Sequence, residues 1–320
     1  MSRLDPAQLE FFAREGYLVV PDLFPSAALE PLRAELTELI HREALRLCAE
    51  GRLTRLYEEE PFERRLTRLY AEVGDEILKA ITGRGGGGHS GRALFELITH
   101  PALLQAVESF IGPEIVGSSV YRIRPKIPGQ VRGVVPWHQD SGYFAPHCDQ
   151  SLVLTCWVPL VDATVETGCL QVLPRTHQQG VFRHYTHGPG GYLVIVDDDL
   201  PPAQWLDTPV PAGGVLFLTN CTPHRSQPHH TDVVRWSLDA RYQSAELPNN
   251  AGQPPEDFDA SIPVHEQACY PPEADFVVQS HLHPEKVVRC WEEFDELRQR
   301  YEKLRPPSPQ RGWVPAPPTP

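Results

Sequence analysis

The feature that most constrains the fold is a series of short β-type runs between residues 114 and 243, separated by proline and glycine. The runs cover residues 115–123, 152–158, 170–173, 192–196, 215–219 and 233–242. No long helical pattern lies between one run and the next, so a parallel sheet with crossover helices is disfavoured. Many short strands joined by turns are typical of an antiparallel sandwich, barrel or jelly roll. The 34 prolines of the chain favour the same interpretation, because proline breaks helices and is common in turns.

Helical patterns lie on both sides of this β-rich stretch. Asp5, Pro6 and Gln8 form a capping-box-like helix start, Gly16 is a stop signal, and residues 17–20 then predict a short strand. Further helices are predicted at residues 29–50, 62–81, 101–111 and 285–304. We therefore expect a mainly β protein with flanking helices.

The chain is predicted to form a single domain over residues 1–304. N-terminal helices occupy residues 1–112, a jelly-roll core 113–245 and a C-terminal extension 246–304. Residues 305–320 contain PPSP and PAPPTP, a composition typical of a disordered tail. The glycine-rich run at 83–88 lacks the Gly-Lys-Ser/Thr ending and the preceding strand of a phosphate loop, so it predicts a surface loop.

Composition limits the partners that we expect. A formal net charge of −13 argues against nucleic acid or an anionic membrane, because neutralising phosphates requires clustered lysine and arginine. No run approaches 18 apolar residues, and the first residues lack the apolar segment of a signal peptide. The seven cysteines are scattered and include no CxxC pair, which is typical of reduced thiols. These features predict a cytoplasmic protein, and they specify no oligomeric state.

Histidine–aspartate triplets make a metal site the main hypothesis for function. The chain has 14 histidines, and three of them begin His-x-Asp triplets: His138/Asp140, His147/Asp149 and His230/Asp232. Two histidines and one carboxylate on one face of a metal leave three positions open, as in non-haem Fe(II) oxygenases. In a jelly roll of that kind, the second histidine comes from a much later strand. An arginine further along pairs with a carboxylate of 2-oxoglutarate.

His224 fits the later histidine. It follows the run at 215–219, Arg235 lies 11 residues further on, and Ser226 can offer a hydroxyl to the same carboxylate. His230 also has an arginine 11 residues later, but the aspartate of its own triplet would repel a carboxylate. The residues alone do not decide whether the His138 or the His147 triplet supplies the metal ligands, because either triplet could be combined with His224 and Arg235.

Strand alternation in the run at 233–242 gives further support. One face carries Arg235, Ser237, Asp239 and Arg241, and the other carries Val234, Trp236, Leu238 and Tyr242. A polar face backed by a strongly apolar face suits a barrel whose mouth binds anions. The alternative is an ordinary half-exposed strand with an Arg–Asp pair in solvent.

Four segments occur in order between residues 11 and 243. They are FFAREGYLVVPDLF (11–24), RPKIPGQVRGVVPWHQDSGYF (124–144), LTCWVPLVDATVETGCLQVLPRTHQQG (154–180) and TPHRS with VRWSLDARYQ (222–226 and 234–243). Together they resemble the phytanoyl-CoA dioxygenase family of Fe(II)/2-oxoglutarate oxygenases. The resemblance implies a double-stranded β-helix, the cupin-like jelly roll. It also places His147 in a loop near the entrance.

The resemblance implies the site residues as well. Fe(II) is expected on His138, Asp140 and His224, which would be the catalytic centre, and 2-oxoglutarate on Arg235 and Ser226, with Trp157 beside it. Thr155 shares a strand face with Trp157, and Lys126 shares one with Arg124. Both Thr155 and Lys126 are therefore candidates for contact with the co-substrate. The candidates for substrate contact are Gln139, Tyr143 and Phe144.

The implied reaction is hydroxylation of a C–H bond of a small-molecule substrate. It consumes O2 and 2-oxoglutarate and forms succinate and CO2. Related halogenases have a small residue at the carboxylate position, so Asp140 argues against halogenation and leaves desaturation or ring closure as variants. The alternative is a non-catalytic or non-oxygenase cupin-like protein that binds another divalent metal, because affinity alone does not favour Fe(II).

Overall fold

A computed structural model describes residues 3–82, 89–259, 261–268, 274–304 and 311–316. The α-helices of these residues are α1 (Pro6–Glu15), α2 (Glu30–Ala49), α3 (Phe62–Val73), α4 (Lys79–Thr82), α5 (Arg92–Ile98), α6 (Pro101–Ile111) and α7 (Trp291–Leu304). The strands are β1 (Tyr17–Val20), β2 (Ile115–Lys126), β3 (Val153–Pro159), β4 (Leu170–Val172), β5 (Tyr185–Thr186), β6 (Leu206–Thr208), β7 (Val215–Leu218), β8 (His224–Ser226), β9 (Arg235–Ser244), β10 (Phe276–Gln279) and β11 (Val314–Pro315).

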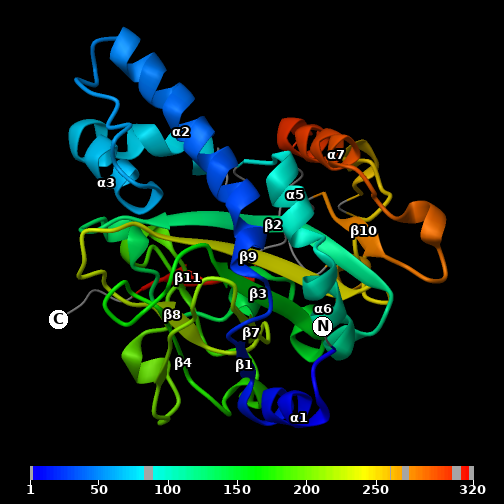
Figure 1. The fold of residues 1–320 in the computed structure, drawn as a ribbon. Helices are drawn as coiled ribbons and strands as arrows, with labels where there is room; N and C mark the ends of the chain where they lie inside the picture. Colours follow the sequence, from blue (N-terminus) through cyan, green and yellow to red (C-terminus); the bar gives the residue numbers. More distant parts are fainter. Residues whose placement is uncertain (1–2, 83–88, 260, 269–273, 305–310, 317–320) are drawn as a thin grey trace.

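Two antiparallel sheets form the body of the molecule (Figure 1). The larger has six strands in the order β1-β7-β3-β9-β2-β10, and the smaller has three in the order β6-β4-β8. Within the described residues the two sheets do not close into a continuous barrel. The predicted fold class, a jelly roll with flanking helices, is confirmed.

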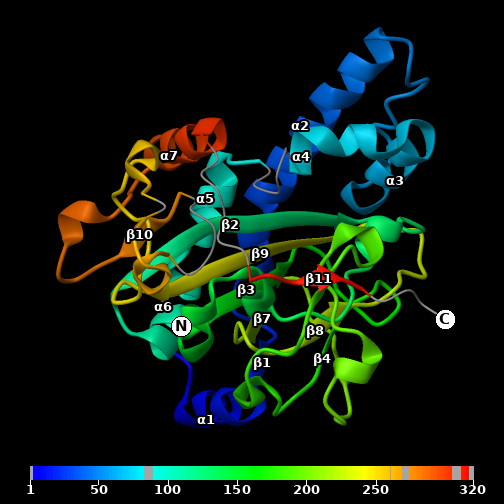
Figure 2. The same cartoon turned by 180° about the vertical axis from the view of Figure 1, so that it is seen from behind.

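Helices cover one face of the large sheet. Both views show α2, α5 and α7 on the same side of β2 and β9 (Figures 1 and 2). Trp236, Leu238 and Tyr242 of β9 are buried in the main hydrophobic core, and the Tyr242 hydroxyl donates to the carbonyl of Ile98 in α5 at 2.5 Å. Alternation along β9 therefore turns the remaining, polar face toward the small sheet.

The predicted start of the chain is confirmed in detail. The Asp5 side chain accepts from the amide of Gln8, and the Gln8 side chain accepts from the amide of Asp5, which completes a capping box. Gly16 ends α1 in the left-handed conformation that favours glycine, at φ 83°. β1 then pairs with β7 at the edge of the large sheet.

Some predicted elements differ from the structure. The helix expected over 62–81 is divided at Gly74 into α3, a 3-10 turn and α4. The strand expected at 192–196 is wrong, because only Val194 forms a bridge, to Tyr185. β5, β6 and β8 were not predicted, since two or three residues are too few to show an alternating pattern. The loop predicted at 83–88 lies outside the described residues.

The predicted tail also differs. Within it, residues 311–316 are described, and β11 pairs in parallel with β5, Val314 opposite Tyr185 and Pro315 opposite Thr186. Residues 305–310 and 317–320 of that prediction lie outside the described residues.

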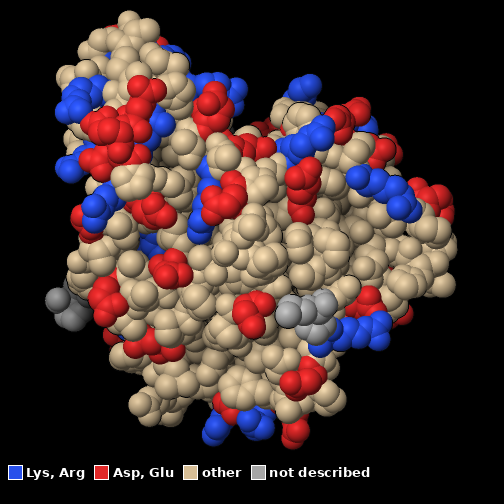
Figure 3. Space-filling model, in the orientation of Figure 1, with Lys and Arg blue, Asp and Glu red and all other residues tan. Residues whose placement is uncertain are grey.

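The surface is charged but mixed in sign. On the face shown in Figure 3, acidic and basic side chains gather over α2 and α3. Ion pairs in this part of the chain include Arg46 with Glu43, both in α2, and Arg52 with Glu76. None of the described helices is long and apolar enough to cross a membrane.

Candidate metal centre and active site

Three of the predicted ligands meet in space. One ligand atom from each of His138, Asp140 and His224 lies within 4.8 Å of the others, and all three residues are buried. His138 and His224 form an isolated antiparallel bridge, with amide-to-carbonyl distances of 3.0 and 2.9 Å, and their ring centroids are 4.2 Å apart. Backbone pairing between the His-x-Asp segment and β8 thus brings together residues far apart in the sequence.

Hydrogen bonds orient both imidazoles. Nδ1 of His138 donates to the carbonyl of Pro136 at 2.9 Å, and Nδ1 of His224 donates to the carbonyl of Thr222 at 3.0 Å. Since a carbonyl only accepts, each Nδ1 carries a proton, and Nε2 is the nitrogen of each ring that remains for a metal. Burial, with the charge of His224, holds the pKa of His138 well below its usual range, which favours the neutral form that binds metals.

The carboxylate of Asp140 is held by two side chains. Arg241 donates from Nε to Oδ2 at 3.2 Å and from Nη2 to Oδ1 at 2.8 Å, and Thr155 donates to Oδ2 at 2.5 Å. Burial alone would raise the pKa of Asp140, but the charges of Arg241 and His224 outweigh it and hold the pKa well below its usual range. The site therefore presents an ionised carboxylate beside two buried imidazoles.

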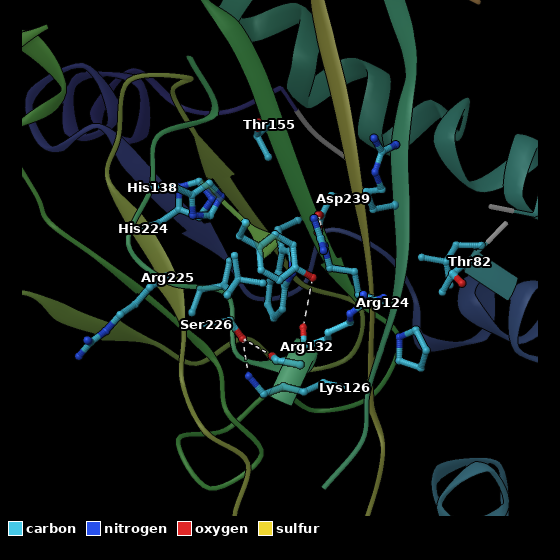
Figure 4. Close-up of a pocket in the computed structure, with 18 of the residues that line it drawn as sticks. Thr82, Arg124, Lys126, Arg132, His138, Thr155, His224, Arg225, Ser226 and Asp239 are labelled. Carbon is cyan, nitrogen blue, oxygen red and sulfur yellow. Dashed lines mark hydrogen bonds and ion pairs between the residues drawn. The ribbon is translucent and has the colours of Figure 1, made fainter. Parts of the chain in front are cut away.

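Two buried basic side chains lie at the other end of the site, where Figure 4 shows Lys126 beside Ser226. Arg235 and Lys126 are only 2% and 3% exposed, and both contact the hydroxyl of Ser226. Arg235 also donates to Ser237 at 2.6 Å, and its Nε has no hydrogen-bond partner among the described residues. The Trp157 ring lies under its guanidinium, 5.1 Å from centroid to Cζ.

The electrostatics of this pair favour an anion. Burial, with the charge of Arg235, lowers the pKa of Lys126 to about 6, and burial lowers the pKa of Arg235 to about 10. Gly168 makes the close approach possible, because a Cβ there would lie 2.7 Å from Cε of Lys126 and 2.8 Å from the carbonyl of Gln227. An added carboxylate would compensate the cost of burying the charge of Arg235 and would favour a proton on Lys126.

Strand alternation explains which side chains reach the cavity. His224 and Ser226 of β8 point into it. Arg225 between them also borders the cavity, but its guanidinium extends over Trp137 and Trp205 (Figure 4). The cavity has a volume of about 800 Å³. Of the predicted site residues, its lining includes His138, Asp140, His224, Arg235, Ser226, Trp157, Thr155, Lys126, Tyr143 and Phe144.

Two predicted contacts have different surroundings from those expected. Gln139 does not line the cavity: it is fully buried, donates to the carbonyls of Gly180 and Cys221, and accepts from the amide of Phe182. These bonds brace the loop, and contact of Gln139 with a substrate stays a prediction. Thr155 borders the cavity and its hydroxyl donates to Asp140, and its contact with the co-substrate stays a prediction.

The competing triplets lie elsewhere. His147 bonds to the carbonyl of Gln267 at 3.0 Å, Asp149 pairs with Arg311, and His230 is exposed. Arg241 was missed as a site residue, although its place on the polar face of the strand was the signal that could have found it.

An antiparallel jelly roll that buries two histidines and one carboxylate around an open cavity defines the class of mononuclear non-haem metal enzymes. The chain belongs to the phytanoyl-CoA dioxygenase family, since the family model described as Phytanoyl-CoA dioxygenase (PhyH) matches residues 12–237. Family membership assigns it to the Fe(II)/2-oxoglutarate oxygenases.

Individual relatives are distant. Phytanoyl-CoA dioxygenase domain-containing protein 1 of Mus musculus is 24% identical over 262 residues, covering 73% of this chain and 88% of that protein. The peroxisomal phytanoyl-CoA dioxygenase of Homo sapiens is 27% identical over 249 residues, covering 75% and 68%. Among solved structures, the non-heme monooxygenase ThoJ in its apo form superposes with a TM-score of 0.58 at 20% identity, covering 93% of this chain and 96% of that one. The likeness to ThoJ shows the shared fold.

Proposed function

We propose that the protein is an Fe(II)- and 2-oxoglutarate-dependent dioxygenase that hydroxylates a C–H bond of a small-molecule substrate and forms succinate and CO2. The observation that carries the proposal is the juxtaposition of a buried His-Asp-His triad with two buried basic side chains, Arg235 and Lys126, in one cavity. Another metal-binding cupin-like protein would need the triad but would have no use for Arg235 and Lys126.

The donor set fits iron. Two imidazole nitrogens and one carboxylate oxygen suit Fe(II), and the cavity leaves the opposite side of the triad open to further ligands. His138, Asp140 and His224 would hold the metal. When bound, Fe(II) together with 2-oxoglutarate and O2 supplies the oxidising power for breaking the C–H bond.

The residues at the cationic end fit 2-oxoglutarate. Arg235 would bind the far carboxylate through its guanidinium, and its unpartnered Nε leaves a donor to spare. Ser226 would add a hydroxyl, and Lys126 would contribute a second charge once it takes up a proton. Trp157 shields this end from water, which strengthens each of these interactions.

The rest of the cavity would position the substrate. Tyr143 is 40% exposed, lies with its ring centroid 6.1 Å from that of His138, and accepts from the amide of Leu193 through its hydroxyl. Phe144 is buried beside the guanidinium of Arg241. Tyr143 thus forms the wall beside the metal, where the reacting carbon of a substrate would lie.

The experiment is O2-dependent conversion of 2-oxoglutarate to succinate by the iron-loaded protein, with metabolite extracts screened for a mass gain of one oxygen. Asp140→Ala is expected to abolish both products, and His230→Ala, which changes an exposed histidine of a rejected triplet, is expected to leave them unchanged. Normal succinate formation by Asp140→Ala would rule out the proposed ligand set.

A further inference from the structure

The C-terminal segment lies against the loop that carries Asp140. β11 pairs with β5, and the amide of Ala316 donates to the carbonyl of Thr186 at 3.2 Å. Figure 2 shows β11, in red, beside the jelly roll and well away from α7. We call residues 311–315 the C-terminal clamp.

Two side chains of the clamp bond directly to the backbone of the loop. Nη1 of Arg311 donates to the carbonyl of Ser141, and the indole nitrogen of Trp313 donates to the carbonyl of Gly142 at 2.7 Å. Arg311 is anchored in turn by a two-point ion pair with Asp149, where the two side chains are only 8% and 17% exposed. A bidentate pair of this kind fixes the guanidinium in direction as well as in position.

His184 completes the contact. Its ring lies 5.3 Å from that of Trp313, and a Cβ added at Gly142 would be 2.6 Å from its Nε2. That Nε2 accepts from the amide of Gln139 at 3.0 Å, and Nδ1 donates to the carbonyl of Phe182 at 2.8 Å. Burial lowers the pKa of His184 to about 4, so the ring stays neutral and can accept.

The clamp therefore contacts the backbone after Asp140 directly, and it reaches the backbone before Asp140 through the ring of His184. Gln139 precedes Asp140 and is bonded through His184, while Ser141 and Gly142 follow it and are bonded by Arg311 and Trp313. Nothing in the clamp lines the cavity.

We propose that the C-terminal clamp positions Asp140 for metal binding by fixing the loop backbone on either side of it. Arg311 and Trp313 are thus positioning residues. The proposal rests on the metal site of the proposed function and not on the oxidation that follows. Groups that orient metal ligands from outside typically change metal affinity by about 10- to 100-fold when they are removed.

The test is titration of the metal-free protein with Co(II) alone, followed by its visible spectrum. Arg311→Ala and a chain ending at residue 304 are expected to bind Co(II) about tenfold or more weakly, with a changed spectrum. Arg311→Lys, which keeps the charge, should recover part of the affinity. Val314→Ala is the matched control, since that side chain is 47% exposed and only its backbone pairs with β5.

Thermal unfolding of each metal-free variant separates positioning from general stability. A folded truncated protein with a Co(II) affinity within twofold of the full chain would overturn the proposal. If truncation prevents folding, the Arg311→Lys and Trp313→Phe proteins test the proposal instead. Co(II) affinities equal to that of the unchanged chain would overturn the proposal, and weaker affinities would support it. Asp140→Ala distinguishes a failure of the clamp proposal from a failure of the proposed metal site. Normal Co(II) binding by the Asp140→Ala protein would contradict the metal site itself.

Discussion

Arg235 offers the sharpest test of the co-substrate site. It is 2% exposed, and its hydrogen bonds among the described residues run to Ser237, Ser226 and the carbonyl of Gly168. A carboxylate of 2-oxoglutarate would be its charged partner. Arg235→Ala would leave that carboxylate in a buried site with only Lys126 opposite it.

Removing one partner of a buried ion pair costs about 3–5 kcal/mol. At about 1.4 kcal/mol for each factor of ten, this is a loss of affinity of about 100-fold or more. Lys126 remains beside the site and takes up part of the charge, so we expect the lower end of this range. Arg235→Lys should lose less, because it keeps the charge but not the two-point geometry.

Calorimetric titration of 2-oxoglutarate into the Ni(II)-loaded protein measures this affinity without turnover. Arg42→Ala is the matched control, because this arginine of α2 is 65% exposed and does not line the cavity. Metal affinity should be largely unchanged in both variants. A loss of less than fivefold in a folded Arg235→Ala protein would refute the assignment.

Three further outcomes are expected. The pKa of Lys126 is about 6 without co-substrate, so the lysine is mostly neutral at pH 7.5. A carboxylate of 2-oxoglutarate beside it raises that pKa, so binding of 2-oxoglutarate should be accompanied by uptake of a proton. Calorimetry in buffers of different ionisation enthalpy measures this uptake, and Lys126→Met should abolish it; equal uptake in both proteins would contradict the prediction. Arg241→Leu leaves the buried Asp140 carboxylate without its ion pair and should lower the free energy of unfolding of the metal-free protein by about 3–5 kcal/mol. Urea denaturation measures this change, and an unchanged unfolding midpoint would argue against the ion pair. Gly168→Ala, at φ +73°, should weaken 2-oxoglutarate binding by displacing Lys126, and unaltered affinity would show that the close packing is not needed.

The alternation of polar and apolar residues predicted which face of the strand after His224 borders the site. The polar face predicted for the strand after His224 is the cavity face of β9, and its apolar face is in the core. Arg241 was placed on the polar face but given no role, because the arginine 11 residues after His230 was set aside together with that triplet. Its true partner, Asp140, comes from a distant loop, and only the folded chain brings the two together.

The C-terminal clamp shows the limit of composition. A proline-rich ending predicts disorder because it offers little apolar surface to bury. Arg311 and Trp313 nevertheless attach this segment to the jelly roll through a few specific hydrogen bonds and ion-pair contacts with Ser141, Gly142 and Asp149. Such single anchors have no periodicity, so no sequence pattern indicated them.

The most direct test of the central claim is a visible absorption spectrum of the protein with Fe(II) and 2-oxoglutarate in the absence of O2. If His138, Asp140 and His224 hold the iron and Arg235 holds the co-substrate beside it, a weak charge-transfer band should appear only when both are present. It should be lost in Asp140→Ala and require far more 2-oxoglutarate in Arg235→Ala. A protein that binds Fe(II) through these residues and yet gives no band at any concentration of 2-oxoglutarate would contradict the account.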